Sequence, residues 1–135
     1  MRSLFIFFCL MVLVPSGIHE AYAKKEGHIK WWKNPKIVKE LDLSSAQVER
    51  IEDIFSSYKG KIVTLNSELD KKEKELRKVV KDPNSTKEEV LKLSDEVGRT
   101  KGELRRLEVN MFLEIRDVLT PAQREKLQTI KARYR

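Results

Sequence analysis

Two short phrases that mark helix starts constrain the fold of this chain more than any other feature. They read LSSAQ at residues 43–47 and LTPAQ at residues 119–123. In each phrase a hydroxyl side chain can accept a hydrogen bond from the backbone N–H three residues later, where a glutamine can bond back to the N–H of the cap. A helix is therefore expected to begin at each phrase, with a leucine in front that packs onto the first turn. The residues that carry this pattern are Leu43, Ser44, Gln47, Leu119, Thr120 and Gln123.

The chain between the phrases has the periodicity of two long helices. Residues 44–81 contain no proline, and the turn sequence DPNS follows at residues 82–85. Ser85 and Glu88 are expected to form another capping box, which opens a helix that runs to about residue 118. Apolar residues recur in alternating steps of three and four, which keeps one narrow seam on each helix and predicts an antiparallel hairpin. The seam residues are Val48, Ile51, Phe55, Tyr58, Ile62, Leu65, Leu69, Leu76, Val79, Val90, Leu93, Val97, Leu104, Leu107, Met111 and Val118.

Three polar residues interrupt this seam, namely Lys72, Thr100 and Glu114. The long stem of Lys72 is expected either to carry its ammonium group to solvent or to meet an acidic partner such as Asp95 across the hairpin.

Two shorter helices are expected at the open end of the hairpin, one beginning at Asn34-Pro35 and the other at Thr120. The long helices carry a second apolar stripe there, onto which the short helices would dock as hooks. A chain of this size has little core, so a second copy is expected to supply further burial. The predicted fold is all-α: a hooked helical hairpin of four helices, two long and antiparallel and two short, paired into a homodimer. The second stripe consists of Ile54, Val109, Phe112, Leu113 and Ile115.

Residues 1–23 are predicted to be a cleaved signal peptide. Arg2 gives a positive start, residues 4–14 are almost entirely apolar, and Ala21-Tyr22-Ala23 fits the small-x-small cleavage rule. The run is shorter than the ~20 apolar residues that span a bilayer. Cys9, the only cysteine, lies inside it, so the mature protein would contain no disulfide. We expect an exported protein with a basic, tryptophan-containing leader at 24–33 and a four-helix domain at 34–135.

Charge and composition exclude several classes of function. The chain has 28 basic and 21 acidic residues, and removal of the signal peptide takes one of each, Arg2 and Glu20, so the net charge of +7 persists. The surplus lies at the two ends, residues 24–40 and 116–135, which each hold six basic and two acidic groups. Export separates a basic chain from nucleic acid, so phosphate binding of that kind is not expected. With one histidine after processing, no cysteine and no glycine-rich phosphate loop, the chain is not expected to be an enzyme or to hold a cofactor.

The predicted mature chain has few of the side chains that bind transition metals. Zinc, nickel and copper prefer a converging set of imidazole, thiolate or thioether ligands. The mature chain offers one histidine, His28, and one methionine, Met111, which belongs to the predicted seam. Glu26 and His28 are weak candidate ligands, and no metal site is assigned.

Two adjacent tryptophans precede the first short helix among lysines. One of Trp31 and Trp32 is expected to cap the end of the core, while the other remains partly exposed beside positive charge. Together with Lys33 and Lys36 they could contact a partner protein, and the same groups would suit a membrane surface.

The duplicated phrase, the signal peptide and the long hairpin resemble the periplasmic Spy/CpxP family of LTxxQ-motif proteins, over about residues 31–135. Leu43, Ser44 and Gln47 match the first family motif, with serine in place of the more usual threonine. The second copy of the motif is matched by Leu119, Thr120 and Gln123. The physical role expected for these residues is to hold the helix starts and to clasp the base of the hairpin.

The resemblance implies a periplasmic location and a curved homodimer of this hairpin, and it implies a function as well. Family members include ATP-independent chaperones that hold unfolded proteins, inhibitory partners of envelope-stress sensor kinases, and zinc- or nickel-responsive relatives in heavy-metal resistance. The sequence favours a chaperone that binds partly unfolded envelope proteins on a basic and apolar dimer surface. A heavy-metal sensor or buffering protein acting with a signalling partner remains an alternative, as does an adaptor that docks on the periplasmic domain of a sensor kinase.

Overall fold

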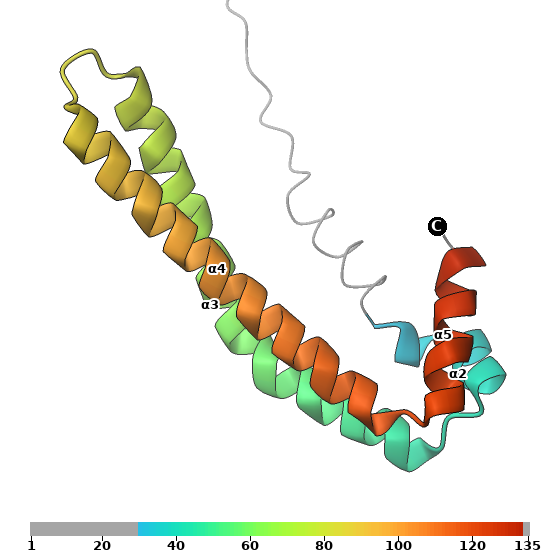
Figure 1. The fold of residues 1–135 in the computed structure, drawn as a ribbon. Helices are drawn as coiled ribbons and strands as arrows, with labels where there is room; N and C mark the ends of the chain where they lie inside the picture. Colours follow the sequence, from blue (N-terminus) through green and yellow to red (C-terminus); the bar gives the residue numbers. More distant parts are fainter. Residues whose placement is uncertain (1–29, 134–135) are drawn as a thin grey trace, which may run out of the picture.

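The computed structural model describes residues 30–133, which form a long helical hairpin with a hooked base (Figure 1). The two long helices are α3 (Ser45–Lys81) and α4 (Lys87–Val118), which lie antiparallel along each other. The 3-10 helix η1 (Trp31–Lys33), α2 (Pro35–Leu41) and α5 (Pro121–Arg133) gather at the open end. No strand occurs in this part of the chain. The all-α hooked hairpin with two long and two short helices is therefore confirmed.

Side-chain caps begin the helices at the residues that the sequence predicted, with one exception. Asn34 caps α2, its Oδ1 accepting from the N–H of Lys36 at 3.0 Å. Ser44 caps α3 with a complete capping box. The box that opens α4 is formed by Thr86 and Glu89, so the prediction of Ser85 and Glu88 was wrong by one residue.

The reason for this shift lies at the end of α3. The hydroxyl of Ser85 turns back and donates to the carbonyls of Val79 at 2.7 Å and Asp82 at 2.8 Å, so it satisfies the C-terminal end of α3. Thr86 is then free to accept from the N–H of Glu89 at 3.2 Å. Ser85 and Thr86 both fit the pattern of a capping box. Ser85 is taken up by carbonyls at the end of α3, so Thr86 becomes the cap of α4.

The buried residues form two separate clusters. The larger lies at the base, where the short helices meet the ends of α3 and α4. The smaller lies along the hairpin seam, where Leu69, Val97 and Leu104 are buried, so the arm is held by a much thinner core than the base. The base cluster consists of Trp32, Ile37, Leu41, Ile51, Ile54, Phe55, Ile115, Leu119, Leu127 and Ile130.

Polar residues on the seam find partners inside the hairpin. Lys72 donates to the hydroxyl of Thr100 on α4 at 3.0 Å and pairs with Glu68, one turn earlier on α3, at 2.8 Å. Thr100, which is 5% exposed, occupies the facing seam position. The expected partner Asp95 was therefore wrong, because the residue that faces Lys72 is a neutral acceptor. Glu114 accepts a hydrogen bond from the hydroxyl of Tyr58 across the hairpin.

The second apolar stripe is covered only in part. Ile54 and Ile115 are buried in the base cluster. Val109, Phe112 and Leu113 stay 41%, 46% and 37% exposed, so the expectation that the hooks cover the whole stripe was wrong for them. Figure 1 gives the reason, since α5 turns across the end of α4 and does not run back along it.

Candidate functional site

The residues of the two phrases meet at the base of the hairpin, and each phrase first closes its own capping box. In the first, the N–H of Gln47 donates to Ser44 Oγ at 3.1 Å, and the N–H of Ser44 donates to Gln47 Oε1 at 3.1 Å. In the second, the N–H of Gln123 donates to Thr120 Oγ1 at 3.2 Å, and the N–H of Thr120 donates to Gln123 Oε1 at 3.0 Å. Each glutamine oxygen is therefore engaged at the start of its own helix.

The two glutamine amides also bond to each other. Gln47 Nε2 donates to Gln123 Oε1 at 2.8 Å, and Gln123 Nε2 donates to Gln47 Oε1 at 3.2 Å. Gln47 Nε2 further donates to the carbonyl of Val118 at 3.0 Å. Gln123 Nε2 lies 3.2 Å from the carbonyl of Leu41 and 3.3 Å from that of Asp42. This glutamine clasp joins the starts of α3 and α5 to the ends of α4 and α2.

The leucines of the phrases pack beside the clasp. Leu119 is 3% exposed and belongs to the base cluster. Leu43 is partly buried and packs against the same cluster. The turn between α2 and α3 passes through Asp42, which adopts a left-handed conformation with φ of 52°. Its carbonyl is one of those that Gln123 reaches, so this turn is held by the second phrase.

The tryptophans divide into one buried and one partly exposed residue. Trp32 is 1% exposed, and its ring centroid lies 5.4 Å from that of Phe55. Trp31 is partly buried and packs edge-on against Trp32 at 5.7 Å. Lys33 and Lys36, which the sequence grouped with the tryptophans, are both exposed. The structure therefore keeps Trp31 and the lysines at the surface of the base.

Glu52 on α3 receives three donors from the segment around η1. The indole N–H of Trp32 donates to it at 2.8 Å, and the ammonium groups of Lys30 and Lys33 lie 3.2 Å and 3.1 Å from its oxygens. Burial alone would raise the pKa of Glu52, but the hydrogen bonds from Trp32, Lys33 and Lys30 outweigh it and lower this pKa from 4.5 to about 2. Glu52 is therefore an ionised anchor for this segment at neutral pH.

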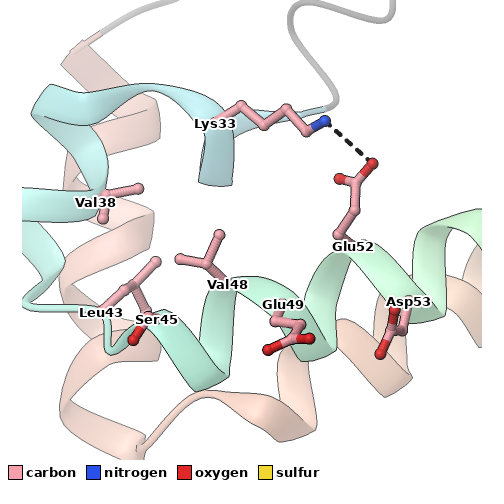
Figure 2. A pocket seen from close by; sticks show the side chains of 8 residues that line it. All are labelled: Lys33, Val38, Leu43, Ser45, Val48, Glu49, Glu52 and Asp53. Atoms are coloured by element: carbon pink, nitrogen blue, oxygen red, sulfur yellow. Dashed lines mark ion pairs between the residues drawn. The ribbon is translucent and has the colours of Figure 1, made fainter.

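Beside this anchor lies an open hollow of about 590 Å³ between α2 and the start of α3. Figure 2 shows Lys33 reaching to Glu52 on one side, with Val38, Leu43 and Val48 grouped near the floor. Glu49 and Asp53 also line it, so the hollow combines an apolar floor with an acidic edge. Its full lining is Lys33, Val38, Leu43, Ser45, Val48, Glu49, Glu52 and Asp53.

A second hollow, of about 330 Å³, lies in the corner between α4 and α5. Apolar side chains form most of its wall, and two arginines stand at its edge. Lys131, one turn beyond Leu127 on α5, places its ammonium 5.2 Å from the ring centroid of Phe112. The residues that line the hollow are Trp31, Phe112, Ile115, Arg116, Leu119, Arg124, Glu125, Leu127 and Gln128.

The described residues, 30–133, contain no group of three histidine, cysteine, aspartate or glutamate side chains placed to hold a metal ion. The weak candidate ligands Glu26 and His28 lie outside the described residues, as does the predicted signal peptide. Within the same range no helix is long and apolar enough to cross a membrane.

A comparison with protein-family models matches residues 30–131 to the model described as LTXXQ motif family protein. The chain belongs to this family. It is the Spy/CpxP-type family, so the resemblance seen in the sequence is confirmed. Comparisons with curated proteins and with solved structures gave no match.

The LTXXQ family is a non-enzymatic helical family, and membership suggests a Spy/CpxP-like protein. In this member the motif glutamines bond to one another and to backbone carbonyls of helix ends, which is a structural arrangement with no reactive group. The motif therefore holds the helices of the base in place, and with them the exposed side chains that these helices carry.

Sequence reasoning missed Glu52 and Lys131. Glu52 lies 20 residues from Trp32 on a helix face rich in charge, so no local pattern distinguishes it from its neighbours. Lys131 is one of six basic residues near the carboxyl end of the chain, and only the fold places it beside Phe112. Only the apolar stripe of α4, which includes Phe112 and Ile115, could have indicated the second hollow from the sequence.

Proposed function

We propose that this LTXXQ family member is a periplasmic, ATP-independent chaperone that captures partly unfolded envelope proteins. The observation that carries this proposal is the apolar stripe at the base end of α4. Val109, Phe112 and Leu113 are exposed there side by side, on a helix whose surface also carries arginines such as Arg105 and Arg116. Exposed apolar groups beside positive charge suit unfolded chains, which present hydrophobic side chains and acidic residues.

The location and the assembly are parts of the same proposal. A periplasmic site is supported by the signal-peptide features of residues 1–23 and by the general location of the family. A homodimer is supported by the thin core of the arm, where Leu69, Val97 and Leu104 are the buried residues and Val63 is 49% exposed. A second copy that covers part of this surface would add burial that the single hairpin lacks.

The test is an aggregation assay with a chemically unfolded model protein, followed by light scattering without ATP. The protein is expected to suppress aggregation near stoichiometric ratios. The double variant Val109→Ser with Leu113→Ser should lose most of this suppression while keeping its helical circular dichroism. Its matched control is Val80→Ser with Leu91→Ser, which removes similar exposed side chains from the arm and should retain activity in the assay.

Repeating the assay with zinc separates the alternatives. Suppression that is independent of zinc supports the chaperone. Suppression or dimer stabilisation that requires zinc would replace it with the metal-responsive function, whose candidate ligands are Glu26 and His28. No suppression in either condition would overturn the chaperone proposal and leave the regulatory adaptor of a sensor kinase.

A further inference from the structure

The hollow between α4 and α5 has the build of a small-ligand site. Its volume of about 330 Å³ falls at the lower end of the ~300–1,000 Å³ typical of ligand pockets. Ile115, Leu119 and Leu127, all buried, line it together with the partly exposed rings of Trp31 and Phe112. Such a lining favours an apolar group, and the volume suits one narrow chain more than a folded partner.

The two arginines that line the hollow are already paired with an acidic side chain. Arg116 and Arg124 both lie near Asp117, at 3.4 Å and 3.5 Å, so part of their charge is compensated. Arg124 Nε also donates to the carbonyls of Arg116 and Leu119, each at 3.1 Å, at the end of α4. The one acidic side chain in the lining is Glu125.

Lys131 differs from both arginines. Within residues 30–133 it forms no ion pair. Its ammonium lies 5.2 Å from the ring centroid of Phe112, which lines the hollow, while Lys131 itself is not one of the lining residues. Burial lowers the pKa of Lys131, because the charged form loses hydration there. An ion pair between an anion and a half-buried ammonium is stronger than one with a solvated surface lysine, because water screens the half-buried charge less.

We propose that this hollow binds the acyl chain of a fatty-acid-type anionic amphiphile, whose carboxylate pairs with Lys131. The apolar wall takes the chain, and Lys131, whose ammonium lies over the lining residue Phe112, takes the head. Binding at this site does not depend on client capture, although Phe112 belongs both to the hollow and to the stripe proposed for capture. Because the ligand contacts α4, α5 and Trp31 together, its binding also stabilises the hook.

The probe is decanoate below its micellar concentration, added to protein purified from cells that express the full-length chain. Binding is followed by isothermal titration calorimetry and by the fluorescence of Trp31, which lines the hollow. One saturable site per chain is expected. Decanol, with the same chain and no charge, should bind about tenfold more weakly, and decyltrimethylammonium should bind more weakly still.

Two variants locate the site. Lys131→Met keeps most of the length of the side chain and removes its charge. It should weaken the binding of decanoate about tenfold, with little effect on decanol. Lys126→Met removes an equally charged but exposed residue from α5, and should bind decanoate normally. Phe112→Ser, at a 46% exposed position, should weaken both ligands. Circular dichroism checks that each variant is folded.

Three outcomes would overturn the proposal. They are unsaturable binding of decanoate, equal affinity for all three head groups, and equal losses in Lys131→Met and Lys126→Met. Binding to vesicles that contain anionic phospholipid, without binding of monomeric decanoate, would also overturn it and assign these cations to a membrane surface. The aggregation assay on Lys131→Met keeps the two proposals separate, because client capture should persist in that variant.

Discussion

At the scale of single residues, Glu52 accepts a hydrogen bond from the segment around η1 and forms two ion pairs with it. Its carboxylate accepts from the Trp32 indole and lies within 3.2 Å of two lysine ammonium groups. These contacts hold the segment around η1 against α3, which keeps Trp32 inside the base cluster. A buried tryptophan ring contributes more apolar area than any other side chain there, so the anchor and the packing support each other.

This arrangement predicts a specific loss of stability in acid. The folded pKa of Glu52, about 2, lies below the ordinary value of 4.5, so its contribution is present above pH ~4.5 and is lost as pH falls toward 2. Glu52→Gln should lower the free energy of unfolding at pH 7 by ~1–2 kcal/mol, after allowance for solvent screening of a side chain that is about one third exposed. The difference from wild type should shrink toward zero near pH 2.

Urea unfolding at several pH values measures this effect. Glu49→Gln is the matched control, because Glu49 is an exposed carboxylate that lines the same hollow on the same helix. A loss in Glu52→Gln that does not change with pH would show that shape, and not charge, carries the interaction.

At the scale of elements, the glutamine clasp decides how the helices join. Four helix ends converge on Gln47 and Gln123, which are 76 residues apart in the chain. Each amide caps its own helix and also donates to a carbonyl at the end of another helix. The ion pair between Arg133 and Glu40 adds a second link between α5 and α2. The hooks are thus held to the hairpin by this polar junction as well as by the base cluster.

Removing one half of the clasp should therefore loosen the whole base. Gln123→Ala is expected to cost ~1–3 kcal/mol in the free energy of unfolding, since partly buried carbonyls lose their donors. Thr120→Ala, which removes only a cap, should cost ~0.5–2 kcal/mol. Gln128→Ala removes an exposed glutamine from the same helix and should change little. Urea unfolding measures all three, and equal effects of Gln123→Ala and Gln128→Ala would show that the clasp contributes no stability.

At the scale of the whole molecule, charge and shape act together. The chain carries a net charge of +7, and the hooks α2 and α5, which each hold more basic than acidic residues, lie at the same end of the hairpin (Figure 1). The exposed part of the α4 stripe lies at that end as well, with Lys131 over Phe112. Long-range attraction and short-range apolar contact are therefore available in one region for a captured chain.

Capture of an acidic unfolded protein should consequently depend on salt through the rate of association. Raising ionic strength from ~0.02 to ~0.3 M should lower the association rate constant about tenfold or more, because the Debye length shortens. The dissociation rate should change less, since apolar contacts govern it. Stopped-flow fluorescence with a labelled client measures both rates. An unfolded basic client of equal length is the control, and the same salt dependence for both clients would contradict the electrostatic account.

The local structure of this protein was determined by its sequence alone. Ser44 and Thr120 mark helix starts because a cap acts over three residues, and the steps of three and four along α3 and α4 place the seam because helical geometry is regular. Even the error at Ser85 was an error of one residue, between two neighbouring hydroxyl groups.

Tertiary structure decided every contact between distant parts of the chain. The sequence could not show which tryptophan is buried, that Glu52 receives the indole N–H, or that Lys72 faces Thr100. Nor could it show that the amides of Gln47 and Gln123 pair, or that Phe112 remains exposed under Lys131. These contacts depend on the angle at which the hooks cross the ends of α3 and α4. That angle results from packing the base cluster as a whole, which no local sequence pattern specifies.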